Sequence, residues 1–275
     1  MINNPPSLRS LEMVGLFPQL HYLTPEEEKY LHAGSDGNRR MFYNGIFNTP
    51  DEAARNAVQL ADNEHEPLYF TYFPKAEDKL VELGVAFYQK FLEGNFGGLS
   101  NSTKKFQDFM YRYGNTGAIV DAHSRGSLTV GNGMRDFEKH GIHGIGYKTD
   151  IRFFGPADNA ASTANTVYFV SDGKKDHIYL QNHIFDPIGM VFGYNFPTFY
   201  KVPLKLPYVL FPPAIPMIEQ GKALGGFKPS THGCYGNASA ACKHAYGTHH
   251  NDNTKIYAPR AILDYLGLGY LWRKE

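Results

Sequence analysis

A strand, a tight turn and a helix are predicted over residues 117–137, and this unit constrains the fold more than any other stretch. It opens with the apolar run Ala118-Ile119-Val120, whose β-branched pair is typical of a buried strand. The segment Ala122-His123-Ser124-Arg125-Gly126 follows, and we refer to it as the serine turn. Beyond it, apolar residues recur at roughly helical spacing, at Leu128, Val130, Met134 and Phe137. The stretch therefore predicts a strand joined to a helix by a turn with a serine at its tip.

The small residues Ala122 and Gly126 lie two positions before and two positions after Ser124, where larger side chains would crowd the backbone of a sharp turn. Such a turn exposes the serine oxygen and directs the first amides of the next helix toward charge that develops beside it. This layout is that of the nucleophile elbow of α/β-hydrolases, although the first small residue is alanine here. An ordinary strand-to-helix turn is the alternative.

Predicted strands and helices alternate over most of the chain. Strands are expected at 41–43, 68–73, 118–120, 151–154, 166–170 and 178–184, and helices at 50–61, 77–92, 102–113 and after the serine turn. This alternation favours an α/β fold with a mostly parallel central sheet and helices on both faces. No repeat or linker divides the chain, so one α/β-hydrolase domain is expected over residues 39–275.

Residues 1–38 are predicted to form a leader that packs on the domain or links it to something upstream. A short helix is expected near Thr24, with Thr24 as its N-cap and Pro25 at its first position. The first ten residues contain two prolines and no long apolar run, so we expect no signal peptide. The chain is then either cytosolic or a piece of a longer secreted protein. The apolar segment 202–218 contains five prolines and a lysine, which excludes a membrane-spanning helix there.

The charge balance excludes a general affinity for nucleic acid. The chain has 27 basic and 27 acidic residues, so it carries no net field that would attract a polyanion. Its two cysteines, Cys234 and Cys242, are close enough in sequence to pair, but two free thiols are the alternative. No cofactor is expected.

A serine nucleophile needs a base and an acid that orients the base, and in α/β-hydrolases the acid follows the serine along the chain. Asp186 directly follows a predicted strand, which is the expected place for the acid. Its competitors are Asp158, after an earlier strand, and Asp172 and Asp176, which are typical of solvated turns. The alternative for Asp186 is a turn begun by the Asp186-Pro187 pair.

For the base, His232 is the preferred candidate among the twelve histidines, because it follows Asp186 and lies in a glycine-rich loop. His244, His249 and His250 also follow the acid, and the last two are expected at the surface. The side chain of His123 must point away from Ser124, so we expect it to serve in packing or in shaping the site.

An oxyanion hole needs two backbone amides beside the serine. One is expected from Arg125, the residue after the serine, and the second from Gly45 and Ile46, which follow an early strand. Glycine at position 45 would also let a substrate approach the backbone closely.

Several segments, taken together and in order, resemble one family of bacterial domains. They are Asn44-Gly45-Ile46 with the alanine-rich helix after it, AHSRGSLTVGNGM, FDPIG and HGCYG, within roughly residues 39–242. This combination is similar to a hydrolase-like domain at the C-terminal ends of filamentous-haemagglutinin-like and other polymorphic toxin proteins. The chain departs from many hydrolases at Ala122 and Ser127, where glycine is common.

The resemblance implies an α/β-hydrolase of lipase or esterase type, with Ser124 as nucleophile, Asp186 as acid and His232 as base. It further implies that the chain is secreted or delivered into a target cell as part of a larger protein. Toxicity toward a neighbouring bacterium and a cognate immunity protein would follow.

The expected activity is therefore that of a serine ester hydrolase, with phospholipid as the preferred substrate and possible contact with a membrane surface. Residues 188–218 are rich in aromatic residues, methionine and proline, as a lid or an acyl-chain groove would be. Buried crossover packing is the alternative for this segment. Two other functions stay open. One is a zinc site that gathers Cys234 and Cys242 with His232 and His244, or with the His249-His250 pair. The other is a non-catalytic binding domain on a hydrolase-like fold.

Overall fold

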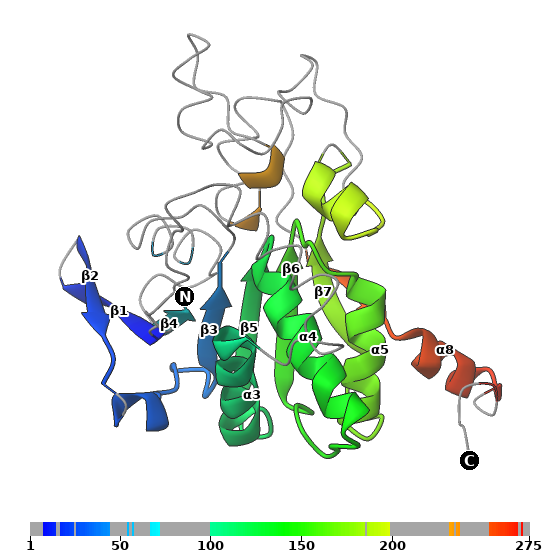
Figure 1. Ribbon diagram of the computed structural model, residues 1–275, viewed down its shortest axis with the longest axis horizontal. Helices are drawn as coiled ribbons and strands as arrows, with labels where there is room; N and C mark the ends of the chain where they lie inside the picture. Colours follow the sequence, from blue (N-terminus) through cyan, green and yellow to red (C-terminus); the bar gives the residue numbers. More distant parts are fainter. Residues whose placement is uncertain are drawn as a thin grey trace, which may run out of the picture.

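The described residues form an eight-stranded mixed sheet with helices packed against it (Figure 1). The computed structural model describes residues 8–14, 17–24, 26–44, 54, 57, 67–71, 100–184, 186–198, 231–233, 235, 236, 253–268 and 271. Its strands are β1 (Leu8–Val14), β2 (Phe17–Tyr22), β3 (Arg39–Tyr43), β4 (Leu68–Thr71), β5 (Ala118–His123), β6 (Thr149–Phe154), β7 (His177–Gln181) and β8 (Thr254–Tyr257).

The strand order is β2-β1-β4-β3-β5-β6-β7-β8. The five strands from β4 to β7 in this order are parallel to one another, while β1, β2 and β8 pair antiparallel at the two edges. The predicted α/β class with a mostly parallel sheet is confirmed. Strand β5 lies inside the sheet, between β3 and β6, so the serine turn begins at the carboxyl end of an interior strand.

Helices α3 (Asn101–Tyr113), α4 (Gly126–Lys139) and α5 (Ala160–Val170) cover one face of the sheet (Figure 1). Two of them begin at capping side chains that accept a backbone N–H. Ser100 accepts from Thr103 at 3.4 Å, and Asn159 accepts from Ser162 at 2.8 Å. These caps satisfy amides that a helix end would otherwise leave without a partner.

Alternate residues of β3, β4 and β6 enter two different cores. On the helix-covered face, Val120 and Ala122 of β5 join apolar side chains such as Phe106, Met110 and Met134. On the opposite face, a second cluster contains Phe42, Ala54, Ala57, Leu68, Phe70, Phe154 and Tyr235. Ala54 and Ala57 are helical, in agreement with the helix predicted at 50–61; the rest of that helix, and the one predicted at 77–92, lie outside the described residues.

The strand predicted at residues 166–170 is wrong, because this segment is the last part of helix α5. Its run of β-branched and aromatic residues favours a strand locally. The Asn159 cap begins a helix upstream, however, and Thr163, Val167 and Val170 then fall on one buried face. Packing against α4 and β7 therefore overrides the local preference.

The leader contains two strands that the sequence did not predict. Strands β1 and β2 form an antiparallel hairpin, and β1 pairs with β4, so residues 8–22 extend the same sheet. Near the expected short helix, a 3₁₀ turn covers Glu27–Lys29. Thr24 and Glu27 exchange hydrogen bonds there as a capping box does, at 2.7 and 3.3 Å. The division of the chain at residue 38 stays a prediction.

Strand β8 and helix α8 (Pro259–Tyr265) were also not predicted, and they complete the far edge of the sheet. No helix in the described part of the chain is both long and apolar enough to cross a membrane.

Gly126 is required by the contact between helix α4 and the end of strand β3. A Cβ atom at this position would collide with the backbone carbonyl of Tyr43 and press on that of Asn44. Because both obstacles are backbone atoms at the carboxyl end of an interior strand, they cannot rotate away as a side chain could. The small residue at the end of the serine turn thus has a physical reason beyond crowding inside the turn itself.

We expect Gly126→Ala to lower the free energy of unfolding by about 3 kcal/mol, as overpacking against fixed backbone does. Urea denaturation measures the change. The control is Gly141→Asn, because Gly141 has open space around its Cα and a left-handed φ of 64° that asparagine tolerates. Equal, small losses in the two variants would contradict this account of the contact.

Candidate active site

Ser124 lies at the junction of β5 and α4 in a strained backbone conformation. Its φ is 53°, a left-handed value that few residues other than glycine adopt. The turn is held by neighbours: the Ser124 amide donates to the Phe154 carbonyl at 3.2 Å, and the Ser124 carbonyl accepts from the Ala157 amide at 3.1 Å. Strain that is fixed by surrounding structure is characteristic of functional turns.

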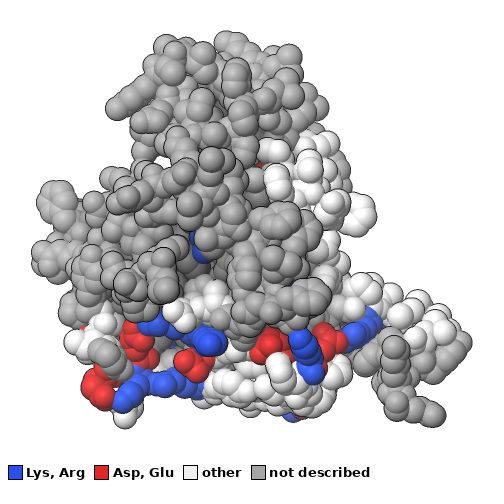
Figure 2. Space-filling model, viewed as in Figure 1, with Lys and Arg blue, Asp and Glu red and all other residues white. Residues whose placement is uncertain are grey.

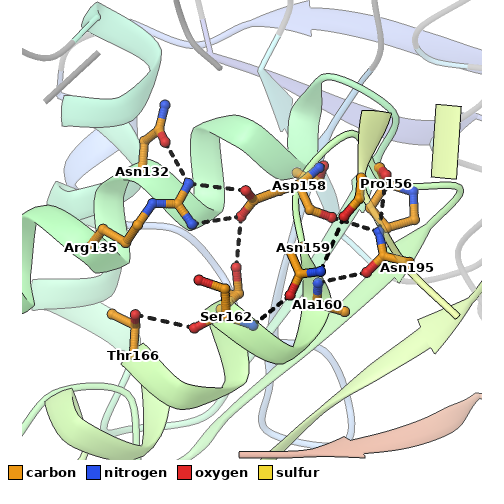
Figure 3. A network of polar contacts seen from close by, with 12 residues as sticks. Asn132, Arg135, Pro156, Asp158, Asn159, Ala160, Ser162, Thr166 and Asn195 are labelled. Carbon is orange, nitrogen blue, oxygen red and sulfur yellow. Dashed lines mark hydrogen bonds and ion pairs between the residues drawn. The ribbon is translucent and has the colours of Figure 1, made fainter. Parts of the chain in front are cut away.

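Ser127 and Asp158 brace the serine turn from behind. The Ser127 hydroxyl donates to the Ser124 carbonyl at 2.6 Å and accepts from the Asp158 amide at 2.9 Å. The Asp158 carboxylate receives two hydrogen bonds from Arg135, at 3.0 and 3.1 Å, and one from Thr163 at 2.8 Å. This network joins α4, the loop after β6 and the start of α5 (Figure 3).

The four candidate acids have different partners in the structure. Asp158 is committed to Arg135, and Asp176 lies against its neighbour His177. Asp172 lies 3.6 Å from His143 at the opposite end of α5 from Asp158. Asp186 is the one of these four carboxylates that contacts His232.

Asp186 is fully buried just beyond strand β7, and its carboxylate accepts several hydrogen bonds. The amides of Ile188 and Gly189 donate to one oxygen at 2.9 and 3.3 Å, and the Tyr235 hydroxyl donates to the other. Burial alone would raise the pKa of Asp186, but His232 and the hydrogen bonds from Tyr235 and Gly189 outweigh it and lower that pKa. Asp186 is therefore a buried anion.

His232 lies in a short 3₁₀ helix, Thr231–Gly233, with its ring against Asp186. Its Nδ1 lies 2.9 and 3.0 Å from the two carboxylate oxygens. Because an ionised carboxylate can only accept, Nδ1 carries the hydrogen, and a neutral ring then has its lone pair on Nε2. The side chain is 18% exposed, so this imidazole is open to solvent while its partner is not.

His123 connects the serine turn to the imidazole of His232. The two rings stack with centroids 4.5 Å apart, and His123 Nε2 donates to the backbone carbonyl of His232 at 2.8 Å. Burial, and secondarily the nearby His232, lower the pKa of His123 to about 3. A neutral, buried ring next to Ser124 thus supports the segment that carries His232, as the expected packing role requires.

The predicted oxyanion donors are only partly described. Arg125 is buried and lies at the amino end of α4, immediately after Ser124. Gly45 and Ile46 lie outside the described residues. Asn44, which precedes them, is fully buried at the end of β3, and its side-chain amide finds no hydrogen-bond partner within the described part of the chain.

The sequence did not identify Tyr235 as part of the site, nor the contact between His123 and His232. The available signal for Tyr235 was its place three residues after His232 in the HGCYG segment. As for a metal centre, the described residues contain no group of three or more histidine, cysteine, aspartate or glutamate side chains that could hold an ion. Cys234, Cys242, His244, His249 and His250 lie outside those residues.

Comparisons with known proteins identify no relative. No protein-family model, no curated protein and no solved structure matches the chain. The relationship to toxin-associated hydrolases therefore stays a prediction, and functional inference depends on the geometry of Ser124, Asp186 and His232.

We expect His123 to make the protein less stable at mildly acidic pH. A histidine with a folded pKa of about 3 and an ordinary value of 6.5 takes up a proton first in the unfolded chain. Its contribution to stability is present above pH 6.5 and is lost as the pH falls toward 3. Between pH 7 and pH 5 the loss should be about 2 kcal/mol.

Urea denaturation at the two pH values measures this loss. His123→Gln keeps a donor for the His232 carbonyl but cannot titrate, so its stability should depend less on pH. His140→Gln is the matched control, because the side chain of His140 is 60% exposed. If the native chain and His123→Gln lose the same stability, His123 is not the titrating group.

Proposed function

We propose that this protein is a serine ester hydrolase that uses Ser124, His232 and Asp186. The observation that carries the proposal is the buried Asp186 carboxylate in contact with His232 Nδ1, where the His232 ring stacks on His123, the residue that precedes Ser124 in a strained strand-to-helix turn. The sheet order and the position of the turn after an interior strand agree with an α/β-hydrolase fold, which is part of the same proposal.

In the proposed reaction the Ser124 hydroxyl attacks the acyl carbon of an ester while His232 Nε2 accepts the hydroxyl proton. Asp186 holds the imidazole in the required tautomer and stabilises its positive charge. The Arg125 amide, with a second donor from Gly45 or Ile46, stabilises the oxyanion. His232 then gives the proton to the leaving alcohol, and water hydrolyses the acyl-serine by the same route in reverse.

We expect a fluorophosphonate probe to add once to the native chain and not at all to Ser124→Ala, measured as intact mass. Asp186→Asn should slow labelling by at least about a hundredfold, since it removes the charge that stabilises the imidazolium. The control is Asp136→Asn, which alters a mostly buried carboxylate on α4 that accepts from Gln107. No adduct on a folded native chain would exclude the proposed nucleophile.

We favour a lipid as the substrate because an exposed, uncharged and apolar segment follows Asp186 in the chain, at residues 191–196. Four large side chains within residues 191–196 are exposed: Val191 62%, Phe192 52%, Tyr194 76% and Phe196 84%. Figure 2 has an uncharged surface where Figure 1 draws the short helix Ile188–Phe192 in yellow-green. An exposed apolar patch of this kind suits contact with acyl chains or a membrane surface.

Asparagine side chains hold this segment in place. Asn195 donates to the Asp158 carbonyl at 2.8 Å and accepts from the Ala160 amide at 2.7 Å (Figure 3). Asn159 donates to the carbonyl of Tyr194 at 2.9 Å. The exposed rings are thus carried by a backbone that is anchored to the start of α5, close to the candidate acid.

The resemblance to toxin-associated domains suggests a biological role for the proposed hydrolase. Cleavage of phospholipids in a neighbouring bacterium would make the protein an antibacterial toxin, delivered as part of a larger secreted protein. A cognate immunity protein would then block the same hydrolysis.

We expect the Phe192→Ser, Phe196→Ser double variant to cleave phospholipid vesicles at least about tenfold more slowly relative to a soluble p-nitrophenyl ester, because surface contact depends on buried apolar area. Tyr265→Ser is the matched control, since Tyr265 is 91% exposed on α8. The readout is the ratio of the two rates. An unchanged ratio in the double variant would contradict the lipid substrate but not the proposed ester hydrolase.

We also expect a cognate immunity protein to inhibit the cleavage of phospholipid vesicles.

A further inference from the structure

Tyr235 donates a hydrogen bond to Asp186, and this bond has no part in the proposed roles of Ser124, His232 and Asp186. Its hydroxyl donates to Asp186 Oδ2, the oxygen that also lies 2.9 Å from His232 Nδ1. Both donors come from one short segment, three residues apart, and Tyr235 is buried. A phenol and an imidazole therefore share a single carboxylate oxygen.

The direction of the Tyr235 hydrogen bond follows from the charge of Asp186. An ionised carboxylate can only accept, so the Tyr235 hydroxyl donates to it. The amide of His183 in turn donates to the Tyr235 oxygen at 3.2 Å. Burial, and next the charge of Asp186, raise the pKa of Tyr235 well above its ordinary value, so the phenol stays protonated. The result is a chain of donors from His183 through Tyr235 to Asp186, in which each bond polarises the next.

Gly155 leaves the space in which these groups meet. A Cβ atom at Gly155 would collide with Asp186 Oδ2 and the Tyr235 ring and would lie 3.0 Å from His232 Nδ1. Its φ of 47° is itself a left-handed value. The backbone after β6 therefore packs directly against all three side chains.

We propose that Tyr235 is a positioning residue that controls how strongly the Asp186–His232 pair holds a proton. By donating to the carboxylate, Tyr235 spreads its negative charge, so the imidazole gives up its proton at lower pH and stays available as a base. This inference rests on the proposed hydrolase function and adds a fourth member to its site.

The proposal involves only groups that face the pair. In the described part of the chain, Tyr235 and, from β5, His123 are titratable side chains that contact Asp186 or His232. His123 is uncharged at neutral pH, and His183 contributes a backbone amide to Tyr235. A change in the pH profile on altering Tyr235 would therefore report the bond to Asp186.

The test is the rate of fluorophosphonate labelling of the full chain as a function of pH. For Tyr235→Phe we expect the midpoint of the acid limb to rise by about one pH unit, because an anion that loses a donor binds protons more tightly. The plateau rate should fall about threefold to tenfold as the imidazole loses its fixed orientation.

Tyr113→Phe is the matched control. Tyr113, at the end of α3, is also buried. Its hydroxyl donates to the Lys29 carbonyl at 2.9 Å and accepts from the Leu31 amide at 3.0 Å. This variant loses the same kind of phenol but should keep the native midpoint. A second variant, with 3-fluorotyrosine in place of Tyr235, keeps the ring and makes the phenol a stronger donor, so its midpoint should move to lower pH.

Opposite shifts in the two Tyr235 variants would support the proposal. Unchanged midpoints in the variants, with a native chain that labels at Ser124, would overturn the role of Tyr235 and leave the hydrolase intact. If Tyr235→Phe does not fold, the 3-fluorotyrosine variant decides alone. A native chain that never labels would instead reject the hydrolase itself.

Discussion

The candidate site depends on one charge held away from water. A buried carboxylate is unfavourable unless hydrogen bonds and an opposite charge compensate for its lost hydration. Asp186 obtains that compensation from the amides of Ile188 and Gly189, from Tyr235 and from His232. These donors belong to two segments more than 40 residues apart, so the anion holds residues 186–189 and 232–235 together. The orientation of the imidazole is a consequence of this requirement.

The sheet supplies the second constraint. Strands β5, β6 and β7 are neighbours and parallel, so the segments that follow them emerge at the same edge. Ser124, Gly155 and Asp186 each belong to one of these three segments. Their proximity follows from topology, while the fine positions follow from local features such as the left-handed backbone at Ser124 and Gly155.

Local patterns explain what the sequence could predict. The strand, the turn at Ser124 and helix α4 are contiguous, and their residue spacing encodes them directly. Asp186 and His232 were identified from their order along the chain. Residues 166–170 were misassigned because their preference for strand is overridden by packing, and the pairing of β1 with β4 joins segments that no local pattern connects. Tyr235 was missed for a similar reason, since its contact with Asp186 spans 49 residues.

The anchoring of residues 193–196 has a consequence for how this surface meets other molecules. The side chains of Asn159 and Asn182 donate to backbone carbonyls of this segment. The side chain of Asn195, which belongs to the segment, donates to the Asp158 carbonyl. The shape of the segment is therefore set when the chain folds. A flexible apolar loop would lose conformational entropy on contact and would collapse onto the protein when alone. Here the aromatic side chains already project from an ordered support, and an encounter with an apolar surface needs little further ordering of the chain. The segment is therefore a preformed apolar surface that lies close to Asp186, the candidate acid.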